Sequence, residues 1–73
     1  GDGSGYRFLA DIILELDPIN PQTAAKLLPP LGRWRRFDGK RQALMIAELE
    51  RIVRQSGLSK DVFEQATKSL SRD

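Results

Sequence analysis

Histidine and cysteine are both missing from the 73 residues of this chain. Without an imidazole or a thiol, the chain cannot build a Cys/His zinc site, a cysteine nucleophile, a Ser-His-Asp triad or a disulfide framework. Any metal would have to be held by oxygen ligands. These absences exclude most of the common catalytic and metal-binding chemistries.

Long hydrophobic runs are missing as well, since stretches such as 43–47 contain only a few consecutive apolar residues. No segment is therefore expected to span a membrane. We see no signal peptide, because Gly1 opens a polar stretch without a basic region or an apolar run. Twelve basic and ten acidic residues leave a net charge of +2, which is too small to indicate an acidic partner.

No run of β-branched residues alternates with polar ones, whereas apolar residues recur three and four positions apart. This spacing predicts an all-α protein of about four helices. The first helix is expected over Gly5–Leu16, with Ser4 as its N-cap, and the second from Pro21 to the Pro29-Pro30 pair. The third is expected over Gly39–Gln55, where Gly57 ends it, and the fourth begins after Ser59. We expect Asn20 and Asp38 to cap the second and third helices, and Val62, Phe63, Ala66 and Leu70 to form the inner face of the fourth.

The short turns between these helices predict two consecutive helical hairpins, the unit that HEAT and armadillo solenoids stack. Residues 1–73 would form a single helical segment, although a closed four-helix bundle also remains possible. A chain of this length supplies only about 3 to 5 kcal/mol from one core, so it must pack well, associate or use neighbouring parts. We therefore expect an exposed apolar patch near Phe8 and Ile12 and possible self-association of the isolated chain.

A polar pair marks the second helix. Gln22 and Lys26 are four positions apart and share one helix face. An amide and an ammonium group can together hold a carboxylate or a peptide carbonyl if a cavity lies beside them. Spacing alone, however, favours an ordinary solvent-exposed face.

The basic cluster in the middle of the chain allows two interpretations. Arg33-Trp34-Arg35-Arg36-Phe37 is followed by Lys40 and Arg41, and basic residues between aromatic ones can bind phosphates and stack on bases. Short arginine runs at turns more often solvate a surface, while the aromatic residues fill the seam between helices. Because the net charge is near neutral, we expect no nucleic-acid partner.

Four blocks of residues, in order and covering nearly the whole chain, resemble the extreme C-terminus of bacterial aminopeptidase N, a zinc-dependent membrane-alanyl-aminopeptidase family. These blocks are Asp2-Gly3-Ser4-Gly5-Tyr6; Asn20-Pro21-Gln22 with Ala24-Ala25-Lys26; Arg33-Trp34-Arg35-Arg36-Phe37-Asp38 with Arg41-Gln42; and Leu58-Ser59-Lys60-Asp61-Val62-Phe63-Glu64 with Lys68-Ser69-Leu70.

The resemblance implies that this chain is a non-catalytic part of a C-terminal superhelical domain in a cytoplasmic enzyme. The family removes N-terminal amino acids from peptides with zinc, using His-Glu-x-x-His and Gly-x-Met-Glu-Asn motifs that do not occur here. Catalytic residues, cofactor-binding residues and metal ligands would thus lie in the parent enzyme, and none in this chain.

By the same resemblance, the domain caps the catalytic domain and limits the access of peptide substrates. Gln22 and Lys26 would line the substrate cavity, with Lys26 at a position where the family usually has arginine. Lysine keeps the positive charge but cannot make a bidentate fork. Two alternatives remain: an autonomous helical interaction module and, third, a small nucleic-acid binder that uses residues 33–41.

Overall fold

The computed structural model describes residues 3–71, and within this range every regular element is helical. The four expected helices are present, which confirms the all-α prediction. Two shorter pieces fill the connection between the second and third of them. The elements are α1 (Ser4–Leu16), α2 (Pro21–Lys26), α3 (Pro29–Gly32), the 3₁₀ helix η1 (Trp34–Arg36), α4 (Gly39–Val53) and α5 (Lys60–Leu70).

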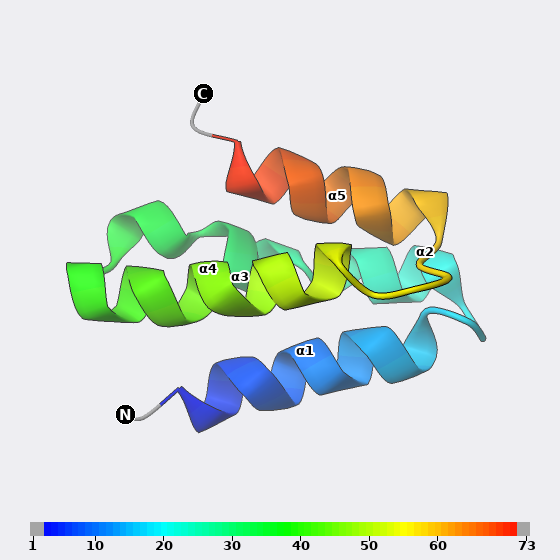
Figure 1. Cartoon of the computed structure of the whole chain (residues 1–73), viewed down its shortest axis with the longest axis horizontal. Coiled ribbons are helices and arrows are strands. Elements are labelled where there is room, and N and C mark those ends of the chain that lie inside the picture. The colour runs from blue at the N-terminus through cyan, green and yellow to red at the C-terminus, as the bar shows by residue number, and fades with distance from the viewer. Residues whose placement is uncertain (1–2, 72–73) are drawn as a thin grey trace.

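Two helical hairpins stack on each other (Figure 1). Helices α1 and α4 run in the same direction and contact each other, and α2 and α5 run back and also contact each other. Within each hairpin, α1 packs on α2 and α4 packs on α5. Equivalent helices of consecutive hairpins thus lie side by side, which is the arrangement of a solenoid.

Three of the four helix starts agree with the predicted caps. The side chains of Asn20, Asp38 and Ser59 accept backbone N–H groups of Thr23, Arg41 and Val62 at 3.2, 2.9 and 3.2 Å. Each bond satisfies a donor that has no partner within its own helix. Asp61 lies in the first turn of α5, where its negative charge interacts favourably with the positive end of the helix dipole.

The predicted N-cap of α1 is wrong by one residue. The cap is Gly3, and Ser4 is the first residue of the helix. Gly3 has a φ of +87°, and a Cβ atom placed there would come within 3.1 Å of the Leu44 side chain. Glycine is needed here both for its left-handed backbone and for its close approach to α4.

The Pro29-Pro30 pair ends α2 and begins α3. The helix stops at Lys26, and the two prolines occupy the first positions of α3, where a missing N–H removes no helical bond. Helix α4 ends at Val53, two residues before the predicted Gln55. Gly57, with a φ of +75°, lies in the connection to α5 and does not cap α4 directly.

The core lies between the two hairpins. Its fully buried side chains come from all the α-helices and are largest at Ile13, Leu28, Leu31, Met45, Leu49, Ile52 and Val62. Trp34 is 9% exposed, and its indole N–H donates to the Ser69 carbonyl at 2.8 Å. Phe63 was predicted to face inward but is 48% exposed. It is rotated about 100° from Val62, so the stripe of Val62 and Ala66 fills the interface instead.

Polar contacts tie both α1 and its C-cap Asp17 to the second hairpin. The carboxylate of Asp17 is 3% exposed and accepts the backbone N–H of Ser59 at 2.8 Å together with the Ser59 hydroxyl. On the surface, Arg51 pairs with Asp11 at 2.7 Å and with Glu48 at 2.9 Å. The hydrogen bond to Asp11 raises the pKa of Arg51. Because the pair is exposed, we expect it to add little stability.

Candidate functional site

The two predicted site residues lie in one hollow. Gln22 and Lys26 project from the same face of α2 into a space of about 320 Å³ between α2 and α5. Ala25 forms part of the floor, and the opposite wall comes from α5. The structure therefore brings Gln22 and Lys26 together, while their contact with a substrate stays a prediction.

The wall opposite Lys26 is acidic, which the sequence analysis missed. Asp61, Glu64 and Gln65 of α5 line the hollow. Among residues 3–71, Lys26 forms no ion pair, and Glu64 lies 3.9 Å from the Lys60 ammonium. The spacing of 61, 64 and 65 marks a common face of α5, but nothing in the sequence indicates that this face meets α2.

This hollow offers hydrogen-bond donors and acceptors on opposite sides. The Gln22 amide and the Lys26 ammonium can donate hydrogen bonds to carbonyl or carboxylate oxygens. The carboxylates of Asp61 and Glu64 can accept hydrogen bonds from backbone N–H groups or from a cationic side chain. The hollow thus presents donors on α2 and acceptors on α5.

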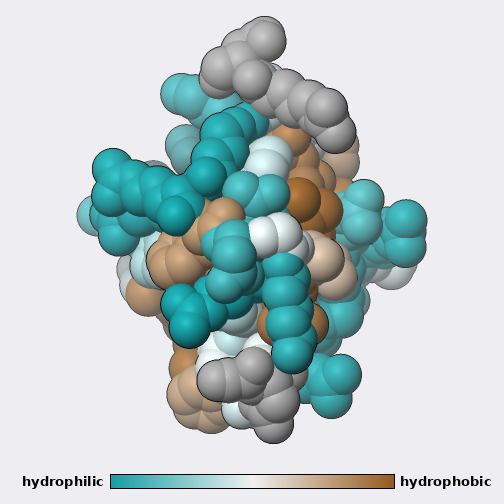
Figure 2. Space-filling model, turned by 90° about the vertical axis from the view of Figure 1, so that its left-hand side faces the viewer, coloured by the Kyte–Doolittle hydropathy of each residue, from teal (hydrophilic) through white to brown (hydrophobic). Residues whose placement is uncertain are grey.

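The basic cluster lies at the other end of the molecule, which is the left side of Figure 1 and the face seen in Figure 2. Arg33, Arg35 and Arg36 are exposed there, and the Arg35 guanidinium lies 4.4 Å from the centre of the Trp34 ring. Trp34 is buried and Phe37 packs against the core. The burial of Trp34 and the partial burial of Phe37 leave little aromatic surface for stacking on bases, so the geometry does not favour the nucleic-acid alternative.

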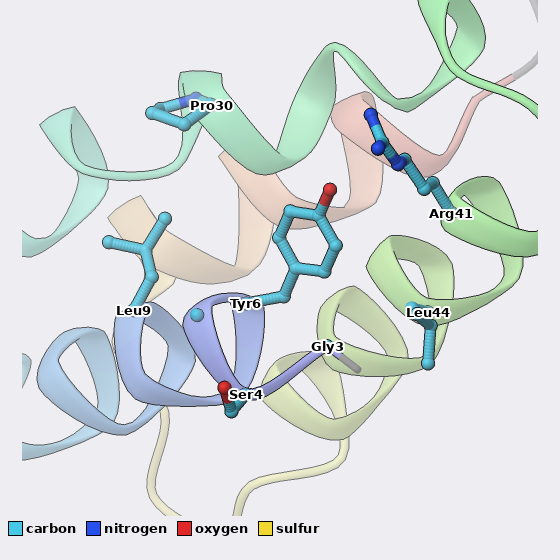
Figure 3. A pocket seen from close by; sticks show the side chains of 8 residues that line it. Gly3, Ser4, Tyr6, Leu9, Pro30, Arg41 and Leu44 are labelled. Atoms are coloured by element: carbon cyan, nitrogen blue, oxygen red, sulfur yellow. The ribbon is translucent and has the colours of Figure 1, made fainter. Parts of the chain in front are cut away.

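A second pocket, of about 470 Å³, opens between the start of α1 and the start of α4 (Figure 3). Its lining residues come from three segments and are Gly3, Ser4, Gly5, Tyr6, Leu9, Pro30, Arg41 and Leu44. The Tyr6 hydroxyl and the Arg41 guanidinium point toward the same part of it. Sequence reasoning missed this pocket because Tyr6 and Arg41 are 35 positions apart and carry no shared motif.

The outer face of α1 carries exposed apolar residues beside the charged Arg7 and Glu15. Phe8 is 66% exposed, as expected for the predicted patch, and Ile19, just after the helix, is 81% exposed. Ile12 is half-buried and lines a shallow groove with Glu15, Leu16 and Ile19. The spacing of 8, 12 and 15 places these residues along one side of α1, away from the core.

The described residues do not fit a zinc site. No group of three or more acidic side chains lies close enough together within 3–71 to hold a metal ion, and the chain has no histidine or cysteine. Over the same residues, no helix is long and apolar enough to cross a membrane.

Comparison with known proteins agrees with the resemblance. The chain is 56% identical over 68 residues to aminopeptidase N of Caulobacter vibrioides and 53% identical over 68 residues to that of Haemophilus influenzae. It is 46% identical over 70 residues to aminopeptidase N of Escherichia coli. These alignments cover 93%, 93% and 96% of this chain but only 8% of each relative.

A family of helical repeats matches almost the whole sequence. The match covers residues 1–71, and its description as ARM repeats agrees with the two stacked hairpins of the structure. The similarity to the C-terminal helical domain of bacterial aminopeptidase N is thereby confirmed. The chain belongs to the family described as "Domain of unknown function (DUF3458_C) ARM repeats".

Proposed function

We propose that this chain is the non-catalytic helical cap of a zinc-dependent, cytoplasmic aminopeptidase N that removes N-terminal amino acids from peptides. The similarity to three aminopeptidases over nearly the whole chain carries this proposal. The chain spans 8% of the length of these relatives, so zinc binding and peptide cleavage would belong to the rest of the enzyme. The motifs that the family uses for these two tasks do not occur in this sequence.

The outer face of α1 is where this cap would continue into the parent chain. In a solenoid, each hairpin buries its apolar faces against both neighbouring hairpins. The second hairpin covers one side of the first, while Phe8 and Ile19 stay exposed on the other side. Residues 1–73 would then form one segment of the C-terminal domain, and the catalytic domain of the same chain would be their partner.

Gln22 and Lys26 would line the substrate cavity of the whole enzyme. A helical wall around the active site admits peptides that fit the cavity and excludes folded proteins, and the exclusion of water strengthens polar contacts inside. The donors on α2 would bind carbonyl oxygens of the peptide away from the scissile bond. Lysine in place of the family's usual arginine would hold them with a single charged group.

Substitution of Lys26 in the whole aminopeptidase tests this role. We expect Lys26→Ala to raise KM for peptides several-fold or to change the preferred peptide length, with little change in kcat, because it removes binding and not chemistry. Lys40→Ala, an exposed lysine that lines neither pocket, is the matched control. Unchanged kinetics for dipeptides and longer peptides alike would refute the assignment.

The exposed face of α1 also supports a second candidate, an autonomous helical interaction module. Such a module would use Phe8 and Ile19 to bind another protein. Sedimentation of the isolated chain separates the two cases: a highly stable monomer favours the autonomous module, whereas a marginal or self-associating chain favours a piece of a longer solenoid.

A further inference from the structure

The pocket between the starts of α1 and α4 is a separate feature from the hollow that holds Gln22 and Lys26. The two lie at opposite ends of the stacked hairpins, since the hollow is formed near the start of α5 and the pocket near the start of α4 (Figure 1). They have no lining residue in common. The cap role proposed above makes no use of this pocket.

Two polar side chains converge in the pocket without a protein partner. Within residues 3–71, neither the Tyr6 hydroxyl nor the Arg41 guanidinium forms a hydrogen bond or an ion pair, although the Arg41 backbone N–H caps α4. Figure 3 places both groups at the same side of the pocket, with the Tyr6 ring standing upright from α1. A planar guanidinium beside a hydroxyl donor matches the two oxygens of a carboxylate.

Apolar side chains form much of the rest of the pocket, together with Ser4 and two glycines. Leu9 and Pro30 lie across from Arg41, and Leu44 forms the wall near Gly3 (Figure 3). A volume of about 470 Å³ falls within the range of roughly 300 to 1,000 Å³ that is typical of small-ligand sites. Apolar walls with a few convergent polar groups are the usual composition of such sites.

We propose that this pocket binds an apolar amino-acid residue through its free α-carboxylate. The Arg41 guanidinium would donate two hydrogen bonds to the carboxylate, and the Tyr6 hydroxyl would donate a third. The aliphatic side chain of the ligand would lie against Leu9 and Pro30. Either a peptide with an apolar C-terminal residue or an N-blocked amino acid carries this chemistry.

Gly5 gives an independent way to close the site. A Cβ atom at Gly5 would meet no heavy atom within 4 Å, so a side chain there would extend into open space. Because Gly5 lines the pocket, we expect the larger side chain of Gly5→Leu to compete with the ligand for space without disturbing the core. This variant leaves both Tyr6 and Arg41 in place.

Nuclear magnetic resonance titration of the ¹⁵N-labelled chain with N-acetyl-leucine tests the proposal. We expect saturable shifts of the backbone signals of residues 4–9 and 41–44. N-acetyl-leucinamide, which lacks the carboxylate, should bind at least about tenfold more weakly, and acetate, which lacks the apolar side chain, should also bind weakly. A tetrapeptide that ends in leucine should shift the same signals if the site accepts peptide C-termini as well as single residues.

The variants follow from the contacts. Arg41→Gln should weaken the binding of N-acetyl-leucine about tenfold, Tyr6→Phe should weaken it several-fold, and Gly5→Leu should abolish it. Arg36→Gln, an exposed arginine outside the pocket, is the matched control and should bind normally. Thermal unfolding of each variant checks that it is folded.

Three results would overturn the proposal. The first is equal binding of N-acetyl-leucine and its amide, which would mean that the carboxylate is not recognised. The second is unchanged affinity in both Arg41→Gln and Gly5→Leu. The third is binding of inorganic phosphate with the same signals and higher affinity, which would make this a general anion site without selectivity for the apolar side chain.

Discussion

The contact between Asp17 and Ser59 joins two residues that are 42 positions apart in the sequence. Asp17 ends α1, and Ser59 caps α5 by accepting the Val62 N–H with the same hydroxyl that donates to Asp17. A buried carboxylate is tolerated only when its hydrogen bonds are satisfied. This chain of bonds fixes the end of the first hairpin against the start of the last helix.

Asp17→Ala should lower the free energy of unfolding by about 1 to 3 kcal/mol, because the Ser59 donors lose a buried partner. Urea denaturation of the purified chain measures the change, and Glu50→Ala, an exposed acid on α4, serves as the control. In a double-mutant cycle, Asp17→Ala and Ser59→Ala should couple, since they remove the same bond. Additive effects of the two substitutions would contradict this interpretation.

At the scale of elements, the first turn of α1 depends on two glycines with opposite requirements. Gly3 has a left-handed backbone and lies against Leu44, whereas Gly5 is inside the helix with open space around it. The first glycine sets the angle at which α1 approaches α4. Glycine at position 5 lowers the stability of the helix, which is consistent with a position where a side chain would narrow the adjacent pocket.

We expect opposite effects from the same substitution at these two positions. Gly3→Ala should destabilise the chain by about 1 to 2 kcal/mol, because alanine is strained at positive φ and its methyl group would press on Leu44. Gly5→Ala should stabilise it by roughly 0.5 kcal/mol, because it reduces the entropy of the unfolded chain. Thermal or urea unfolding of both variants measures the change in the free energy of unfolding. An equal change in the two variants would contradict this description of the turn.

At the scale of the whole molecule, the two outer surfaces of the stacked hairpins differ. The outer side of α1 exposes Phe8, with Ile19 just beyond its end, whereas polar side chains dominate the exposed face of α5 apart from Phe63. A solenoid needs a polar outer face only where no further repeat follows. Of the two surfaces, that of α1 is therefore the one we expect to be covered.

Phe8→Asp should reduce the self-association of the isolated chain, because it replaces the exposed large apolar side chain of α1 with a charge. Sedimentation equilibrium at several concentrations measures the shift toward monomer. Phe63→Asp on α5 is the matched control and should leave association unchanged. If Phe63→Asp reduced association as strongly as Phe8→Asp, α1 would not be the interacting surface.

Much of the local structure could be predicted because its causes are local. Asn20, Asp38 and Ser59 cap their helices through bonds to residues three positions ahead, and the prolines end α2 through their own ring geometry. The start of α1 was missed because Gly3 is chosen partly by contact with Leu44, 41 positions away. Phe63 was misplaced because periodicity locates a stripe on a helix but not its edge.

The sequence alone determined the four main helices, three of their caps, the absence of histidine- and cysteine-based chemistry, and the family, since all of these depend on residue type and on short or ordered spacing. Only the tertiary structure decided which side chains from different helices face each other. These are Asp61 and Glu64 across from Lys26, Tyr6 beside Arg41, and Asp17 against Ser59. These pairs arise from the stacking of the two hairpins. Stacking depends on how buried side chains from distant segments pack together, and the periodicity of each helix does not predict that packing.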